Sequence, residues 1–321
     1  MPFEELPTTP TDDELLDKAF SRAARAGRAQ DGSTGQLAML RTAGNILSDN
    51  LENVATQWPD FGSLHPFYVE LAGTLVDVDT LRQSLSTVTW AGRQCGSIRD
   101  EYHDRIRRAD PETARRHRKQ AFARMADVVE EAGEELAYIA DARNRLNKLP
   151  FIDPEEPAIV VAGYPNVGKT SFVNAVTRAQ NETAAYPFTT TGILVGHLER
   201  DHIRYQLIDT PGLLDRPASE RNEIENQAIS AITHAADCLL VFVDPSETGG
   251  YPLDDQLALR DQLAETFGEV PTLTVCSKAD LSTAVDADCY LSITEEQGLD
   301  ETVDAAVTAI DYEPELPERT G

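Results

Sequence analysis

The sequence predicts an all-α helical bundle followed by an α/β domain with a mostly parallel sheet and one antiparallel edge strand. Residues 1–150 show apolar positions at helical spacing and no strand pattern. From residue 158 onward, short apolar runs alternate with helical segments, which is typical of parallel strands joined by crossover helices. A chain of 321 residues is long enough for two cores. We therefore expect a bundle at 1–150, a linker at 151–157, an α/β domain at 158–311 and an acidic, disordered tail at 312–321.

Four helical stretches are expected in the first domain, near residues 11–29, 35–56, 66–109 and 111–148. Asp110 and Pro111 form a natural cap and first-turn pair for the last stretch. Its apolar side chains recur at helical spacing, which favours a bundle core over a ligand site. They are Met125, Val128, Val129, Ala132, Leu136 and Ile139.

The second domain reads as an alternation of strands and helices. The expected strands are 158–162, 193–198, 203–209, 237–244, 272–277 and 289–293. The expected helices are 171–178, 219–234, 253–267, a short one after 277, and 299–310. The pair 193–198 and 203–209 forms a hairpin, which supplies the antiparallel strand.

A phosphate-binding loop is predicted between the first strand and its helix. Gly163 to Thr170 fits G-x-x-x-x-G-K-[ST], and this strand–loop–helix context is what a phosphate cradle requires. Backbone N–H groups of the glycine-rich turn and the helix N-terminus bind phosphate oxygens. Lys169 would reach the β- and γ-phosphates, and the Thr170 hydroxyl would bind Mg²⁺. The loop residues expected to bind nucleotide are Gly163, Tyr164, Pro165, Asn166, Val167, Gly168, Lys169, Thr170 and Ser171.

Two further segments fit the roles of nucleotide-sensing switches. Asp209-Thr-Pro-Gly212 ends a strand, where Asp209 can hold Mg²⁺ through water and the Gly212 backbone can reach a γ-phosphate. A good turn sequence would look similar, so this motif depends on its neighbours. Between it and the phosphate loop lies Thr189-Thr-Thr191. We favour Thr190 as the residue that completes the Mg²⁺ shell when the γ-phosphate is present; a threonine-rich strand entry is the alternative.

The segment Ser277-Lys-Ala-Asp280 predicts guanine as the base. Asp280 can accept hydrogen bonds from guanine N1–H and its exocyclic amine, which adenine cannot match. Ser277 replaces the usual Asn, with Lys278 beside it. Ser292 and Ile293 could offer a backbone N–H to guanine O6. Together and in this order, the motifs specify a domain that binds GTP.

The sequence lacks one residue that many GTPases use for catalysis. Many GTPases place a Gln after the glycine of the second switch, to orient the attacking water. Leu213 stands there, so hydrolysis should be slow or rely on another group. An Asn at the loop position of Asn166 is the K⁺ ligand in a subset of GTPases, and a bound cation could stand where an arginine finger otherwise would. Alternatively, Asn166 only fixes the loop's turn. The catalytic residues expected are Lys169, Thr190, Gly212 and Asn166.

These motifs resemble the nucleolar GTP-binding protein family in its archaeal form, in the Obg-like branch of the translation-factor-related P-loop GTPases. The segments that carry the resemblance are 163–171, 186–190, 195–198, 209–217 and 221–234, with 39–47, 65–68 and 145–150 upstream. The resemblance implies an α/β P-loop GTPase domain preceded by an all-α helical bundle domain. It also implies a GTPase that acts in biogenesis of the large ribosomal subunit, with its N-terminal helices on ribosomal RNA. The long basic C-terminal extension of eukaryotic members is not seen in this sequence.

A net charge of −27 usually argues against nucleic-acid binding, since phosphate repels carboxylate. Only Lys18, Lys119, Lys148, Lys169 and Lys278 are lysines, and an acidic, lysine-poor surface suits molar salt. At about 1 M salt the Debye length is about 3 Å, so distant charges hardly repel RNA. We interpret the chain as a halophilic archaeal protein whose KCl-rich cytoplasm would keep a K⁺ site filled. The candidate RNA contact is a basic run, with a solvated, ion-paired helix face as the alternative: Arg105, Arg107, Arg108, Arg115, Arg116, Arg118 and Lys119.

The remaining features favour a cytoplasmic protein that is a monomer when free. Four cysteines show no metal-ligand or disulfide spacing, no apolar run is long enough to span a membrane, and no signal peptide is visible. The leading hypothesis is a GTP-hydrolysing switch on pre-ribosomal particles, with GTP or GDP, Mg²⁺ and a possible K⁺ as its cofactors. The alternative is a nucleotide-gated RNA-binding scaffold whose turnover is incidental.

Overall fold

The structure is a computed structural model that describes residues 2–3, 6–147, 152–177, 182–184 and 193–312. The chain forms two compact units. The first contains Met1–Ser63 and Leu75–Asn147, and the second contains Leu64–Thr74 and Lys148–Gly321. The segment Leu64–Thr74, expected in the helical bundle, therefore belongs to the second unit.

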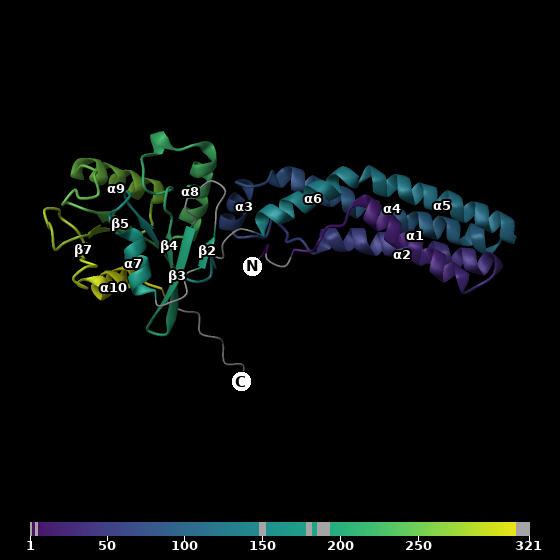
Figure 1. Cartoon of the computed structure of the whole chain (residues 1–321), viewed down its shortest axis with the longest axis horizontal. Helices are drawn as coiled ribbons and strands as arrows, with labels where there is room; N and C mark the ends of the chain where they lie inside the picture. The colour runs from purple at the N-terminus through teal and green to yellow at the C-terminus, as the bar shows by residue number, and fades with distance from the viewer. Residues whose placement is uncertain (1, 4–5, 148–151, 178–181, 185–192, 313–321) are drawn as a thin grey trace. The chain divides into compact units, whose positions relative to one another are not determined.

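The described part of the first unit is helical throughout its regular structure (Figure 1). Thr11 caps its first helix in a reciprocal capping box with Glu14, at 3.2 and 3.0 Å. Asp110 caps the Pro111 helix as expected, accepting from the Glu112 and Thr113 N–H groups. The helices of this unit are α1 (Asp12–Arg28), α2 (Gly32–Thr56), α4 (Val78–Arg107), α5 (Pro111–Glu131) and α6 (Gly133–Leu146).

The core of the bundle contains most of the apolar residues that the sequence predicts. Val128 is only half-buried, and the other five are buried: Met125, Val129, Ala132, Leu136 and Ile139. The single expected helix over 111–148 is interrupted at Ala132, whose backbone (φ −90°, ψ 7°) leaves the helical region. Gly133 then passes close to Asp12, where a Cβ would lie 3.0 Å from Asp12 Oδ2.

The expected helix over 66–109 is also two helices, α3 (Pro66–Gly73) and α4. The break has a local cause, because the Thr74 hydroxyl bonds Leu71 O at the end of α3 and Asp77 caps α4 by accepting from Thr80 N–H. Helix α3 packs within the second unit against α8 (Glu223–Ala235). Glu70 of α3 lies 3.1 Å from His234 of α8.

The second unit is built on one sheet, in the order β2-β3-β4-β1-β5-β6-β7. Strand β3 pairs antiparallel with both β2 and β4, and every other pairing among the described strands is parallel, which confirms a mostly parallel sheet. The antiparallel strand is not at the edge, because short β2 pairs with its outer side. The strands are β1 (Ala158–Ala162), β2 (Glu182–Ala184), β3 (Ile193–Arg200), β4 (Ile203–Asp209), β5 (Cys238–Val243), β6 (Thr272–Cys276) and β7 (Cys289–Tyr290).

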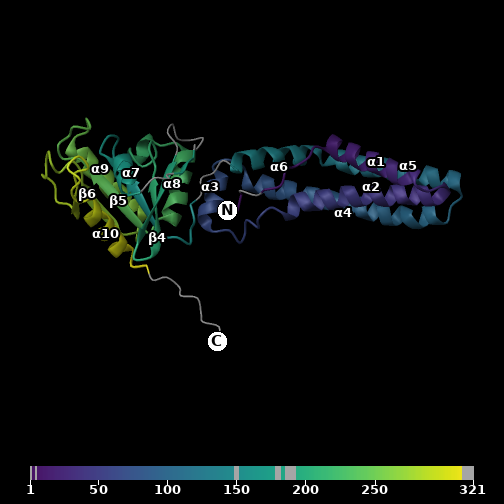
Figure 2. The ribbon, with the colours of Figure 1, turned by 60° about the horizontal axis from the view of Figure 1, so that its bottom comes forward.

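Helices cover both faces of the sheet, α7 (Lys169–Val176) and α10 (Leu299–Ile310) on one, α8 and α9 (Leu253–Phe267) on the other (Figures 1 and 2). Right-handed crossovers from a central β1 require this division. The short helix expected after residue 277 is wrong: Leu281 and Ser282 close one turn on Lys278 O, and no helix continues before β7. The expected helix over 219–234 begins instead at Glu223, after a 3-10 turn at Ala218–Glu220, because Asn222 caps α8.

Candidate nucleotide-binding site

The predicted nucleotide motifs converge on one edge of the sheet. Strands β1, β4, β5, β6 and β7 run parallel, so their carboxyl ends meet at this edge. The segment 163–170 follows β1, 209–212 ends β4, 277–280 follows β6 and 292–293 follows β7. A Cβ built on Gly168 would lie 3.5 Å from Ile293 Cδ1, so the last segment lies beside the phosphate loop.

Three residues of the phosphate loop have positive φ angles, and each is a residue type that tolerates them. Gly163 (φ +127°) and Gly168 (φ +102°) occupy the region that favours glycine, and Asn166 (φ +64°) adopts the left-handed conformation that asparagine tolerates. A Cβ on Gly163 would lie 2.4 Å from Phe242 O, so the loop presses against β5. Gly168 is the N-cap of α7, which directs the helix N-terminus into the loop.

Lys169 is the first residue of α7 and curls back over the loop. Its Nζ donates to Gly163 O at 2.6 Å and to Tyr164 O at 2.8 Å, and the residue is 7% exposed. Burial lowers the pKa of Lys169, against the charges of Asp209 and Asp215. A buried cation on the loop backbone is placed to meet phosphate oxygens.

Thr170 and Asp209 fit a divalent cation. The Thr170 hydroxyl donates to Asp209 Oδ2 at 2.5 Å, and Asp209 is fully buried at the end of β4. Burial raises the pKa of Asp209, while the Thr170 hydrogen bond and the Lys169 charge oppose that rise. Asp209 Oδ1 is buried with no hydrogen-bond partner among the described residues. A hard cation such as Mg²⁺ prefers hydroxyl and carboxylate oxygens, so this pair suits it.

The segment after Asp209 buries the Leu213 side chain, so Leu213 does not contact solvent. Gly212 (φ +80°) donates its N–H to Asp215 Oδ2 at 2.8 Å, and Gly163 N–H donates to Leu214 O at 3.0 Å. Leu213 and Leu214 are both fully buried in the core.

Thr189, Thr190 and Thr191 lie outside the described residues.

The base-recognition segment is tied to its neighbours by backbone and side-chain bonds. The buried Ser277 hydroxyl donates to Val243 O at 3.2 Å, and Ala279 N–H donates to Leu291 O at 3.0 Å. Asp280 is exposed, as a carboxylate that meets a base must be before binding. Ser292 N–H already donates to Gln297 O at 3.0 Å, so it does not offer the N–H expected for guanine O6. Ile293 is the residue of that pair that lies at the phosphate loop.

Sequence reasoning missed the partner of Lys278. Its Nζ lies 2.7 Å from Asp244 Oδ2 and 2.8 Å from Thr248 Oγ1. Asp244 directly follows β5 and is fully buried. Burial alone would raise its pKa, but hydrogen bonds from Lys278, Ser246 and Thr248 outweigh burial and lower the pKa of Asp244. An aspartate directly after an apolar strand was the signal available in the sequence.

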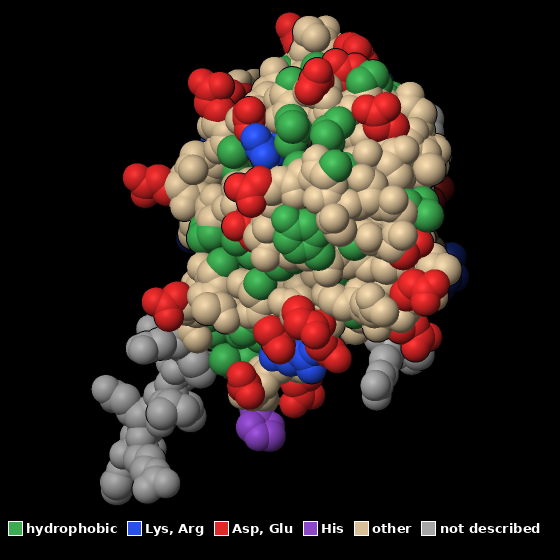
Figure 3. All heavy atoms as spheres, turned by 90° about the vertical axis from the view of Figure 1, so that its left-hand side faces the viewer, with side chains coloured by type: hydrophobic (Ala, Val, Ile, Leu, Met, Phe, Trp, Pro, Cys, Tyr) green, Lys and Arg blue, Asp and Glu red, His purple; other side chains and the backbone are tan. Residues whose placement is uncertain are grey.

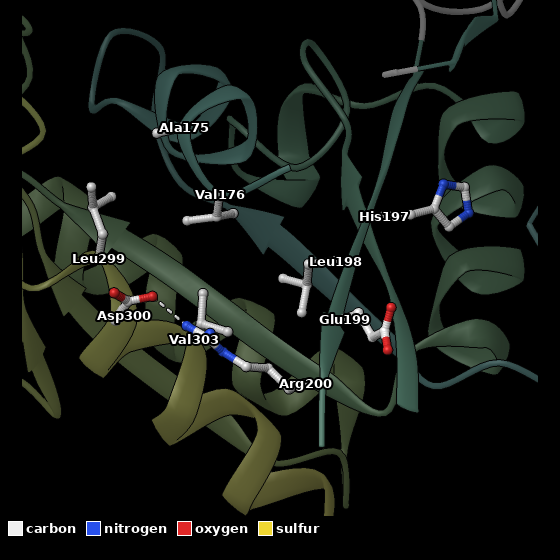
Figure 4. A pocket seen from close by; sticks show the side chains of 9 residues that line it. All are labelled: Ala175, Val176, His197, Leu198, Glu199, Arg200, Leu299, Asp300 and Val303. Carbon is white, nitrogen blue, oxygen red and sulfur yellow. Dashed lines mark hydrogen bonds and ion pairs between the residues drawn. The ribbon is translucent and has the colours of Figure 1, made fainter. Parts of the chain in front are cut away.

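A cavity of about 590 Å³ lies elsewhere in the second unit, at the opposite end of β3 from the nucleotide motifs (Figure 4). Figure 4 shows Arg200 reaching Asp300 across it, and Asp304 lies 3.2 Å from Arg200 Nε. Because this guanidinium is already paired with two carboxylates, we assign no ligand here. The lining residues are Ala175, Val176, His197, Leu198, Glu199, Arg200, Leu299, Asp300 and Val303.

The predicted basic run in the first unit is partly neutralised. Arg105 pairs with Glu101 at 2.9 Å, and Arg107 and Arg108 both pair with Asp104. Arg118 Nε donates to Gln36 Oε1 at 3.0 Å, and its guanidinium lies over the Phe122 ring. The other three side chains are exposed, and no ion pair is seen between them and any described residue: Arg115, Arg116 and Lys119.

The remaining sequence features are the four cysteines and the apolar character of the helices. The four cysteines are buried free thiols, and burial raises the pKa of Cys95 to about 12. Within the described ranges, no helix has the length and apolar character that crossing a membrane requires.

The fold and the converging motifs define a P-loop GTPase domain. Residues 3–153 match the NOG1 N-terminal helical domain, and residues 158–278 match a family described as 50S ribosome-binding GTPase. The chain belongs to the nucleolar GTP-binding protein family.

Several known proteins are similar to this chain. It is 36% identical over 292 residues to the uncharacterized protein MJ1408 of Methanocaldococcus jannaschii, covering 87% of this chain and 81% of that protein. It is 36% identical over 239 residues to nucleolar GTP-binding protein 1 of Drosophila melanogaster, covering 74% of this chain and 37% of that protein. The crystal structure of a nucleolar GTP-binding protein 1 homologue from Plasmodium falciparum is 29% identical, with a TM-score of 0.46, over 50% of this chain and 90% of that one.

Proposed function

We propose that the protein is a GTP-hydrolysing switch that acts in biogenesis of the large ribosomal subunit by binding ribosomal RNA or pre-ribosomal particles. The observation that carries the proposal is the meeting of Lys169, Thr170 and Asp209 at one sheet edge, with Asp280 following β6 at the same edge. The match to a ribosome-binding GTPase family supports the particle as its target.

The chain's own residues divide the work of binding GTP. Backbone N–H groups from Asn166 to Thr170 would hold the phosphates, and Lys169 would exchange its two carbonyl partners for phosphate oxygens. Thr170 and Asp209 would hold Mg²⁺, which supplies charge neutralisation across the phosphates. Thr190 is proposed as a further ligand. Asp280 would select guanine through its two donors.

We further propose that Asn166 holds K⁺, which would stabilise transition-state charge where an arginine finger otherwise would. Asn166 is exposed at the loop tip in a left-handed conformation, and Leu213 is buried away from any attacking water. The proposal fits a KCl-rich cytoplasm, which the acidic, lysine-poor composition favours. Faster turnover in KCl than in equal NaCl, lost in Asn166→Ala, tests it; equal rates in both salts would refute the K⁺ site.

The helical unit is the proposed RNA-binding part of a monomeric protein. Figure 3 shows Asp and Glu side chains spread over one face of the second unit, with few Lys or Arg among them. The exposed cations Arg115, Arg116 and Lys119 of the first unit are better placed to meet phosphates.

Co-sedimentation with homologous large-subunit particles tests the function. We expect co-sedimentation with a non-hydrolysable GTP analogue and release with GDP. Equal co-sedimentation with both nucleotides would contradict a switch. A Thr190→Ala variant that lost turnover but kept full assembly function would favour the scaffold instead.

A further inference from the structure

The helical unit has a polar hollow that the preceding site does not use. It has a volume of about 350 Å³ and lies between α2 and α4. Arg41 and Asn45 line it from α2, and Arg99, Asp100 and His103 from α4. Arg41 and Asn45 belong to the segment 39–47, which carries the family resemblance but has no role in binding GTP.

Close packing of the two helices fixes one wall of the hollow. A Cβ on Gly44 would lie 2.7 Å from Arg99 Cβ and 2.9 Å from Arg99 Cγ, so the Arg99 stem lies directly on the Gly44 backbone. The Arg99 Nη1 then donates to Asn45 Oδ1 at 2.6 Å. Contacts with α2 therefore fix the Arg99 guanidinium, and residues of this unit alone supply these contacts.

Arg41 carries a charge that its immediate partner does not neutralise. Its Nη2 lies 2.6 Å from His103 Nε2. Because arginine only donates, Nε2 accepts and the ring proton lies on Nδ1, which faces Asp104 Oδ1 at 3.4 Å. No ion pair joins Arg41 to a carboxylate of the described chain, so most of its five N–H donors remain available.

The one carboxylate in the hollow is weakly bound there. Asp100 pairs with its sequence neighbour Arg99, at 2.8 Å to Nε and 3.1 Å to Nη2, and is 69% exposed. Asp49 and Glu52 act on Arg99 only at longer range. An exposed pair of this kind contributes little, so an entering anion could replace Asp100 on Arg99.

The hollow lies at the basic end of the bundle. Tyr102, next to His103, contacts the His117 ring of α5 at a centroid distance of 6.2 Å, and Arg118 reaches Gln36 of α2. These contacts bring the exposed Arg115, Arg116 and Lys119 of α5 to the same end of the unit. A chain of phosphates could therefore meet the hollow and these cations together.

We propose that Arg41 and Arg99 form a binding site for a backbone phosphate of RNA, with His103 and Asn45 as the positioning residues. This inference rests on the proposed RNA-binding function and specifies its site. Fork-shaped guanidinium groups bind phosphate oxygens in pairs, which suits two arginines on facing helices. The Asp100 carboxylate occupies Arg99 until the phosphate displaces it.

Binding of transcribed large-subunit ribosomal RNA domains by the full chain in KCl tests the site. Arg41→Gln should weaken binding about tenfold and reduce the slope of log affinity against log salt by about 1. Arg93→Gln is the matched control, because it removes one exposed cation from α4 outside the hollow. Asp100→Asn should strengthen binding, because it removes the competing carboxylate. Melting temperatures would verify that each variant folds.

The outcomes separate this site from the proposed function. Equal losses in Arg41→Gln and Arg93→Gln, or no gain in Asp100→Asn, would overturn the site while leaving RNA binding intact. No RNA binding by the unaltered protein would refute the RNA-binding function itself. Polyglutamate bound through Arg41 in place of RNA would make the hollow a protein-docking site and refute the phosphate site.

Discussion

The Thr170 hydroxyl donates a 2.5 Å hydrogen bond to the carboxylate of Asp209, across 39 positions of sequence. This bond joins the phosphate loop to the end of β4, so the sheet brings together the two residues proposed to bind Mg²⁺. The arrangement also buries a carboxylate whose Oδ1 has no partner in the described chain. A buried carboxylate oxygen without a partner lowers the stability of the protein when no cation is bound.

Asp209→Asn should stabilise the nucleotide-free protein at neutral pH. Burial raises the pKa of Asp209, so its contribution to stability is present below its unfolded pKa and is lost as pH rises through the folded pKa. The amide removes that loss. We expect the melting temperature without Mg²⁺ to rise by about 2–4 °C at pH 7, corresponding to about 1 kcal/mol.

The gain from Asp209→Asn should shrink as pH falls through the raised pKa of Asp209, because the carboxyl then becomes protonated in the native protein. Mg²⁺-dependent GTP binding should be lost at the same time. A variant less stable than the native protein at pH 7 without Mg²⁺ would show that the buried charge of Asp209 does not destabilise the protein.

Gly163→Ala should unfold or strongly destabilise the second unit. The new Cβ would lie 2.4 Å from Phe242 O, at φ +127°. We expect a loss of about 3 kcal/mol or more in chemical denaturation. Gly250→Ala is the matched control: it has φ +88° but nothing within 4 Å, so it should cost about 1 kcal/mol. Similar losses in both variants would mean that close packing on β5 does not matter.

Lys278→Met should leave the buried carboxylate of Asp244 without its ion pair. Removing one partner of a buried pair costs about 3 kcal/mol. The lowered pKa of Asp244 gives stability above its unfolded pKa that is lost as pH falls through the folded pKa. Acid unfolding should therefore begin at higher pH in the variant. Lys278→Met with Asp244→Asn should recover most of the loss; no recovery would place the effect elsewhere.

Asp280→Asn should change the preferred base. The carboxylate is proposed to accept from two guanine donors, and an amide would leave one of them facing an N–H donor. We expect GTP affinity to fall by at least about 100-fold and xanthosine triphosphate to bind in its place. Calorimetric titration with both nucleotides measures this. Unchanged GTP affinity would move guanine recognition to other residues, such as those near Ile293.

Much of the second unit could be predicted because its signals are local. The buried run Ala158–Ala162 followed by the Gly163–Thr170 loop fixes strand, turn and helix with no long-range information. Asp209 could be placed for the same reason. The Lys278–Asp244 pair could not, because Asp244 follows β5 and lies 34 positions away from Lys278 in the sequence.

The helical unit was harder to predict, because an apolar helix face does not specify what it packs against. The apolar residues around Asp77 continue the helical pattern, and so the break between α3 and α4 was hidden until the caps of Thr74 and Asp77 were seen. Nothing in the Pro66–Gly73 sequence indicates packing on α8. The charge of the basic run likewise depends on where Glu101 and Asp104 point.

The most direct test of the central claim is GTP turnover by the full chain in KCl and Mg²⁺, with and without homologous large-subunit particles. Lys169→Ala supplies the baseline, because it removes the buried cation of the phosphate loop. We predict slow turnover by the protein alone, a clear rise with particles, and neither in the variant. Turnover that the particles leave unchanged would contradict a ribosome-linked GTPase switch.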